Sequence, residues 1–244
     1  MKRVAPVALA LVCALGLSGC QSTQEKSDEL AKNAEEVFTA KGLEVREQNP
    51  DFEVVSTEVL FDPDVGGAAV VEIRNKTSEP KVTVPVSIDV TAKGGKIIFE
   101  NNEPGLETSL VEAAVVPPGE SFFWVHDQVL IFSEDKPKAV EAKIGKPRVE
   151  TPDELPKLTI EGVKQRNDPV SGDATIGYVK NESEVFQRKV VVYGVARKGK
   201  KVVAAGRSQI ERIPPGERGF FQIFLIGNSK GAEIELAAPP PVLE

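Results

Sequence analysis

Val70-Val71-Glu72-Ile73-Arg74-Asn75-Lys76-Thr77-Ser78 returns later in the chain as Thr175-Ile176-Gly177-Tyr178-Val179-Lys180-Asn181-Glu182-Ser183, with Asn181 in the place of Asn75. Two further landmarks return in the same order: the basic glycine hairpin at Lys93 as that at Lys198, and Pro117-Pro118-Gly119-Glu120 as Pro214-Pro215-Gly216-Glu217. Three matches in one order indicate an internal duplication. The hairpins are 105 residues apart and the turns 97, so the first copy holds eight extra residues, which we place within 101–108.

Period-two alternation predicts β-strands in both copies. Residues 81–90 alternate β-branched with polar or proline residues, which is typical of a half-buried strand. Pro85 lacks an N–H, so we expect this strand to lie at a sheet edge or to carry a bulge there. Further strands are predicted at 52–61, 68–75, 97–100, 108–116, 121–132 and 139–144.

About seven short strands per copy predict an immunoglobulin-like sandwich. The expected fold class is therefore all-β: two tandem immunoglobulin-like antiparallel β-sandwiches preceded by a short N-terminal α-helix. The expected boundaries are a lipoprotein signal peptide at 1–19, a lipidated spacer at 20–50 with an amphipathic helix at 28–41, a first sandwich at 51–148, a linker at 149–155, a second sandwich at 156–238 and a proline-rich tail at 239–244.

The N-terminus has the pattern of a secretory signal. Lys2 and Arg3 precede an apolar run of about 14 residues, which is shorter than a membrane span. Leu17-Ser18-Gly19-Cys20 follows it and resembles the bacterial lipobox. The resemblance implies cleavage before Cys20, diacylglyceryl transfer to its thiol and acylation of its new amino group. An ordinary signal remains the alternative. Gln21 rather than aspartate after the cysteine favours the outer membrane, facing the periplasm.

The order of landmarks in each copy resembles small bacterial envelope lipoproteins of the YcfL and FxLYD type. Each copy has an Asn-containing turn, a Val-rich strand, a basic hairpin and a Pro-Pro-Gly-Glu turn before an aromatic strand. The resemblance covers residues 51–238 and implies an immunoglobulin-like fold and an envelope role. It identifies no functional residue. Both copies lack the cysteine pair and the third-strand tryptophan of antibody domains.

Composition argues against several classes of function. Removal of residues 1–19 moves the net charge from −7 to about −9, which disfavours binding to nucleic acid and to anionic lipid headgroups. It also removes Cys13, so lipidation of Cys20 leaves no free thiol for a disulfide, a metal site or a nucleophile. The chain has a single histidine, His126. We therefore expect no catalytic residue, no cofactor and no metal.

Four kinds of stretch are candidate sites. Trp124 and His126 form either an exposed aromatic patch for a partner or glycan, or a cover over a sheet edge. The Asp- and Asn-rich turns at 62–67 and 167–173 offer oxygens for calcium, but hairpin turns are favoured. The basic hairpins at 93–96 and 198–201 suit anions, but solvated hairpins are favoured. Residues 189–196 are apolar on both faces, so the strand is central, or one face meets the other domain or a partner; burial within the chain is favoured.

The function expected from the sequence is therefore that of a lipid-anchored, non-enzymatic envelope protein. Its membrane contact is the lipidated Cys20, and its tandem sandwiches bind a protein partner. The alternative is binding of a small molecule or cell-wall glycan between the domains. A carboxylate-only enzyme is the remaining, disfavoured class.

Overall fold

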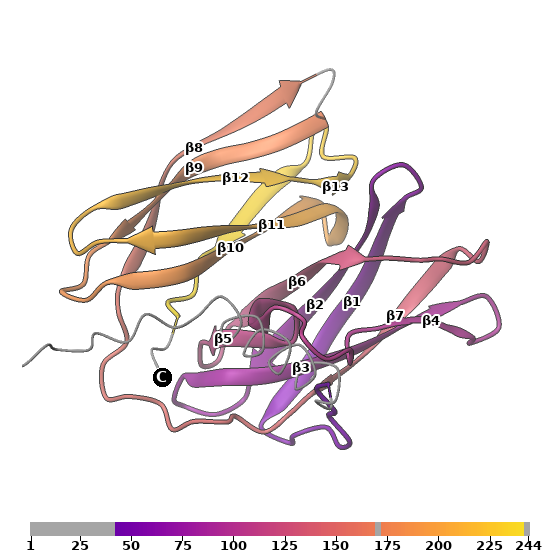
Figure 1. Ribbon diagram of the computed structural model, residues 1–244, viewed down its shortest axis with the longest axis horizontal. Helices are drawn as coiled ribbons and strands as arrows, with labels where there is room; N and C mark the ends of the chain where they lie inside the picture. Colours follow the sequence, from indigo (N-terminus) through magenta and orange to yellow (C-terminus); the bar gives the residue numbers. More distant parts are fainter. Residues whose placement is uncertain (1–41, 169–171, 242–244) are drawn as a thin grey trace, which may run out of the picture. The chain divides into compact units, whose positions relative to one another are not determined.

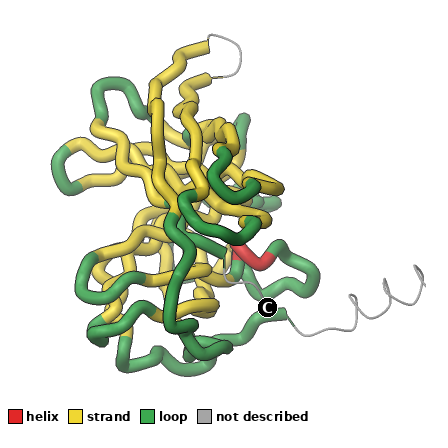
Figure 2. The backbone as a smooth tube through the Cα atoms, turned by 90° about the vertical axis from the view of Figure 1, so that its left-hand side faces the viewer, coloured by secondary structure: helices red, strands yellow, loops and turns green. Residues whose placement is uncertain are grey.

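The computed structural model describes residues 42–168 and 172–241. These described residues belong to one compact unit. Within the described residues the fold is all-β and sandwich-like, and its helical structure is the short 3-10 helix η1 (Figure 2). The predicted all-β class is confirmed. The helix predicted at 28–41 and the anchor Cys20 lie outside the described residues.

The first half of the unit, residues 52–144, forms two facing sheets (Figure 1). One has the antiparallel order β1-β2-β6, and the other has the order β4-β3-β5, with β7 also paired to β3. The elements are β1 (Phe52–Asp62), β2 (Gly66–Asn75), β3 (Lys81–Ala92), β4 (Ile97–Glu100), η1 (Thr108–Leu110), β5 (Glu112–Val116), β6 (Ser121–Val129) and β7 (Pro137–Ile144).

The second half, residues 158–237, repeats this order. Its sheets are β8-β9-β12 and β13-β11-β10-β14, so β8, β9 and β12 correspond to β1, β2 and β6. The elements are β8 (Leu158–Asp168), β9 (Gly172–Asn181), β10 (Gln187–Lys198), β11 (Lys201–Ile213), β12 (Arg218–Phe224), β13 (Ile226–Gly227) and β14 (Glu233–Ala237).

Asn75 and Asn181 occupy the same position in the two halves. Asn75 Nδ2 donates to the carbonyls of Glu79 and Val116, and its Oδ1 accepts from Thr77. The Asn181 side chain makes the corresponding four bonds to residues 183, 185 and 213. Both side chains are fully buried, so each amide satisfies backbone groups that would otherwise be buried without a partner.

The extra residues of the first copy interrupt one strand. Where the second half has the continuous strand β11, the first half has β4 and β5, separated by residues 101–111 with η1. Asn101 holds this insertion in place, because its buried side chain bonds to the backbone of Val86, Ile88 and Leu110. The insertion ends beside β6, where Trp124 Nε1 donates to the carbonyls of residues 109 and 112.

The expectation that Pro85 marks a sheet edge is wrong. Strand β3 lies in the middle of its sheet, with β4, β5 and β7 as partners. Pro85 falls where pairing passes from β5 to β7, and its carbonyl accepts from Gly145 N. The irregular backbone lies two residues earlier, at Thr83, whose φ is 49°.

Two hydrophobic clusters are found among the described residues. One lies within the second half and includes Val190, Val192 and Phe221. The other combines both halves, because Tyr193 and Val195 pack with first-half residues that include Trp124. The two halves therefore share a core.

The segments outside the strands also follow the predicted order. No strand lies between Ile144 and Leu158, around the predicted linker. This segment bonds to the first half: Thr151 Oγ1 donates to the Pro80 carbonyl, and Arg148 pairs with Glu112 at 2.7 Å. The described tail residues 239–241 are half-buried. The predicted domain boundaries stay predictions.

Candidate functional site

Trp124 and His126 on β6, which the sequence analysis considered as an exposed patch, are buried in the structure. Trp124 and His126 are both 0% exposed, so neither an exposed patch nor an exposed edge cover is correct. Trp124 packs 5.9 Å from His126, which meets the Phe99 ring at 5.1 Å. Both expectations fail because these two side chains point toward the other sheet of the first half, where Trp124 bonds to residues 109 and 112 and His126 contacts Phe99 of β4.

Burial makes His126 unsuitable for proton transfer near neutral pH. Desolvation, helped by the positive charge of Arg207, lowers the pKa of His126 to about 3. Its Nε2 is buried and has no hydrogen-bond partner among the described residues, while Nδ1 accepts from Gln128 N at 3.3 Å. His126 is therefore a neutral core residue.

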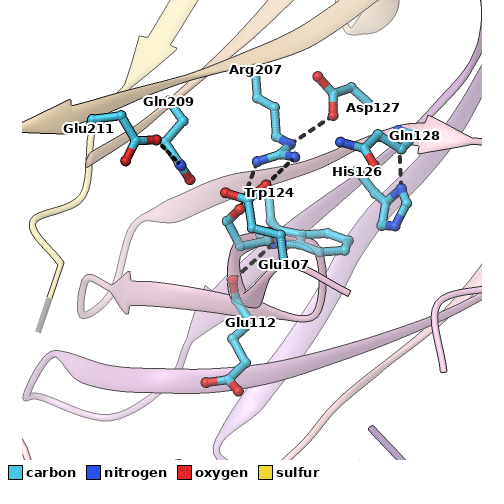
Figure 3. Close-up of polar contacts among 10 residues, drawn as sticks. Glu107, Glu112, Trp124, His126, Asp127, Gln128, Arg207, Gln209 and Glu211 are labelled. Carbon is cyan, nitrogen blue, oxygen red and sulfur yellow. Dashed lines mark hydrogen bonds and ion pairs between the residues drawn. The ribbon is translucent and has the colours of Figure 1, made fainter. Parts of the chain in front are cut away.

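Arg207 joins the two halves through three side chains of the first half (Figure 3). Its Nε donates to Asp127 Oδ1 at 2.7 Å, Nη1 to Ser109 Oγ at 2.7 Å and Nη2 to Glu107 Oε2 at 2.9 Å. Burial raises the pKa of Asp127, an effect that the guanidinium opposes. The Arg207 side chain is only 6% exposed. Two of its partners lie on the insertion, which the sequence analysis located without a role.

A second contact joins the halves further along. Arg197 on β10 lies 3.5 Å from Glu72 on β2 and 3.0 Å from Glu235 on β14. Glu72 also accepts from Ser56. The sheet β1-β2-β6 thus turns acidic groups toward cations of the sheet β10-β11.

Strand β10 explains the apolar stretch 189–196. Val190 and Val192 belong to the cluster within the second half, whereas Val191, Tyr193 and Val195 belong to the shared cluster. The strand is central in its sheet, and its other face meets the first half. The strand is thus central, as the favoured alternative predicted, and one of its faces meets the other half, as the second alternative predicted.

A groove of about 540 Å³ lies where the halves meet. Leu106, Val191 and Tyr193 give it apolar walls, and Arg188 and Lys189 add cations. Its full lining is Thr83, Leu106, Glu107, Thr108, Ser109, Glu112, Ala114, Arg188, Lys189, Val191, Tyr193, Gln209, Pro239 and Pro241. A larger hollow of about 880 Å³ near Gln48 and Lys146 is bordered mainly by exposed polar residues and lacks such walls.

The second half carries an aromatic surface that the sequence analysis missed. Strands β9 and β12 lie side by side (Figure 1). Tyr178 on β9 pairs with Phe220 on β12, and Phe224 lies further along β12. Their alternates Phe221 and Ile223 are buried, so the three rings occupy the outer face of the sheet. We call Tyr178, Phe220 and Phe224 the aromatic face. They are 36%, 52% and 50% exposed, respectively.

The corresponding face of the first half is covered. Phe123 takes the place of Phe220 in the strand after the Pro-Pro-Gly-Glu turn, and it is only 8% exposed. Tyr178 and Phe224 replace Glu72 and Asp127, the two acids that bind second-half arginines. Alignment of the two copies by register would have revealed this exchange of acids for aromatics.

Cations border the aromatic face on the β12 side, and Glu161 of β8 pairs with Tyr178 on the other side. The guanidinium of Arg218 lies 4.7 Å from the centre of the Tyr178 ring, a cation–π distance. Tyr178 and Phe220 meet edge to face at 5.7 Å, and Arg218 pairs with Lys180 across the strands. The surface can therefore bind apolar groups and acidic groups side by side.

The remaining candidates are turns. Val65 N bonds to the Asp62 carbonyl and Asp64 N to Asp62 Oδ1, which is hairpin chemistry. In the second copy Asn167 pairs with Asp173, whose carboxylate accepts from Ser229. The lysines of both basic hairpins are exposed. Within the described ranges, no group of three or more His, Cys, Asp or Glu residues is arranged to hold a metal ion.

Two comparisons add nothing to this description. No protein-family model and no curated protein matches the chain. In residues 42–168 and 172–241, no helix has the length and hydropathy needed to span a membrane.

Proposed function

We propose that this chain is a lipid-anchored, non-enzymatic protein of the bacterial envelope, in which two tandem immunoglobulin-like sandwiches present the aromatic face to a protein partner. One observation carries the proposal. The outer face of β8-β9-β12 exposes three aromatic side chains, whereas the equivalent face of β1-β2-β6 is buried under the other half. Clustered exposed aromatic groups on a soluble domain commonly mark an interaction surface.

The covered face supports a protein as the ligand. In the first half, the outer face of the sheet packs against the sheet of another sandwich, with Phe123 buried and Asp127 paired to Arg207. The same kind of face in the second half is built from larger apolar groups. A partner that docks there buries Phe220 and Phe224 as β10 and β11 bury Phe123.

The charges around the aromatic face favour a partner that differs in charge from the β10-β11 sheet, which covers the equivalent face of the first half. Tyr178 and Phe224 stand where the first half has the acids Glu72 and Asp127, and Arg218 and Lys180 border them. A cationic partner such as the β10-β11 sheet would find no counterpart of Glu72 and Asp127 there. It would also be repelled by Arg218 and Lys180. We therefore propose a partner with an apolar centre and an acidic rim.

The proposed attachment to the membrane is inferred from the sequence Leu17-Ser18-Gly19-Cys20, which follows an apolar run. Two or three acyl chains on Cys20 hold a protein durably, since each buried methylene contributes about 0.8 kcal/mol. Mass spectrometry of the mature N-terminal peptide tests this directly. A diacylglyceryl or triacyl mass on Cys20 supports the anchor, and an unmodified thiol contradicts it.

Site-specific photo-cross-linking in intact envelopes tests the docking surface. The photoreactive residue p-benzoylphenylalanine replaces Phe220 or Phe224, and Phe132 serves as the control, since it is 94% exposed and lies outside the aromatic face. We expect one adduct, shared by positions 220 and 224 and absent at 132. No adduct, an adduct at all three positions or a cross-link within the chain would contradict the proposal.

A second candidate function, binding of a small molecule between the domains, has the groove at the junction of the halves in its favour. Its size falls in the range of about 300 to 1,000 Å³ that ligand pockets occupy.

A further inference from the structure

The groove between the halves has features of a binding site that is separate from the aromatic face. Residues of β3, the insertion and β5 form one side, and residues of β10, β11 and the segment after β14 form the other. Sites at the junction of two domains are common for small ligands. The fold alone therefore brings together side chains that are distant in the sequence.

The carboxylates that line the groove already form ion pairs, whereas the cations that line it do not form ion pairs within the described residues. Glu107 Oε2 binds Arg207 at 2.9 Å, and Glu112 Oε1 binds Arg148 at 2.7 Å. Arg188 and Lys189 form no ion pair within the described residues. The uncommitted charge of the groove is therefore positive, which favours an anionic group on a ligand.

The backbone at the groove is unusual. Thr83 and Lys189 are the non-glycine residues with positive φ in the described chain, at 49° and 51°, and both line the groove. Left-handed backbone costs about 1 to 3 kcal/mol at such residues and gathers at functional sites. Thr83 in β3 and Lys189 in β10 occupy equivalent positions of the two copies. Both copies therefore have left-handed backbone at the same point of the strand that lines the groove.

We propose that this groove binds a short acidic peptide segment. Its carboxylate binds Arg188 and Lys189, and an apolar side chain packs on Leu106 and Val191. The proposal does not depend on the aromatic face, so either can fail alone.

Peptide titration of the chain from Gln21 to Glu244 tests the proposal. The probe is acetyl-Leu-Ala-Glu-amide, and the matched probe is acetyl-Leu-Ala-Gln-amide, which differs only in charge. Methyl NMR signals of Leu106 and Val191 report binding. We expect saturable shifts with the Glu peptide at millimolar concentration and about tenfold weaker binding of the Gln peptide.

Variants locate the cations responsible. Arg188→Gln combined with Lys189→Asn removes both charges, and asparagine tolerates the left-handed backbone at 189. We expect at least about tenfold weaker binding of the Glu peptide. Lys164→Gln, an exposed change on β8 away from the groove, is the control and leaves binding unchanged. No saturable shift up to about 10 mM, equal binding of both peptides or no effect of the double variant overturns the proposal.

Discussion

Arg207→Met tests whether the junction between the halves stabilises the fold. Methionine keeps most of the aliphatic volume of arginine but removes the guanidinium that binds Asp127, Glu107 and Ser109. The Asp127 carboxylate then stays 21% exposed without its partner. Loss of one partner of a buried ion pair costs about 3 to 5 kcal/mol.

The lower end of this range applies here. Glu107 is 34% exposed, so water replaces part of what it loses. We expect a decrease of about 3 kcal/mol in the free energy of unfolding. With an m-value of about 3 kcal/mol/M in urea, the midpoint falls by about 1 M.

A double-mutant cycle with Asp127→Asn separates the pair from other effects. If the two groups stabilise each other, the double variant is more stable than the sum of the single changes predicts, by about 1 kcal/mol or more. Equilibrium urea unfolding of the chain from Gln21 to Glu244, followed by Trp124 fluorescence, measures all four corners. A loss below about 0.5 kcal/mol for Arg207→Met, or no coupling, would refute the reasoning.

Three further predictions have defined outcomes. Asn75→Ala and Asn181→Ala each leave buried carbonyls without a donor and should each lower stability by about 2 to 4 kcal/mol; very different urea midpoints would argue against equivalent turns. Because the folded pKa of His126 lies near 3, below its unfolded value of 6.5, stability from this group is full above pH 6.5 and is lost as pH falls toward 3. From pH 7 to 4.5 this amounts to about 3 kcal/mol, which His126→Leu should abolish in paired urea titrations. Gly206→Ala would place a Cβ 2.2 Å from the Phe224 carbonyl oxygen and should lower the melting temperature, at a cost of about 1 to 3 kcal/mol.

Local sequence patterns were sufficient for the repeat and for most strands, although residues 108–110 of the strand predicted at 108–116 form η1. The alternation at 81–90 and the paired turns at Asn75 and Asn181 depend on neighbouring residues and backbone geometry, which a sequence displays directly. The insertion at 101–108 followed from spacing alone, and the structure places it between β4 and β5.

Contacts between the halves were beyond such reasoning. Trp124 and His126 were expected at the surface or at an edge, but they face the other sheet of the first half, and β10 and β11 cover the opposite face of β6. The partners of Arg207 lie 80 to 100 residues away in the chain, so no local pattern links them. The aromatic face was visible in principle, since Phe220 alternates with Phe221 on β12, but which alternate faces outward depends on the core.

The affinity of the cross-linked partner for variants of the aromatic face tests the central claim most directly. Isothermal titration compares the wild-type chain with Phe220→Ser and with Phe132→Ser, both of which change an exposed phenylalanine. We predict at least tenfold weaker binding for Phe220→Ser, about 1.4 kcal/mol, and unchanged binding for Phe132→Ser. Equal affinities for all three proteins would contradict the account.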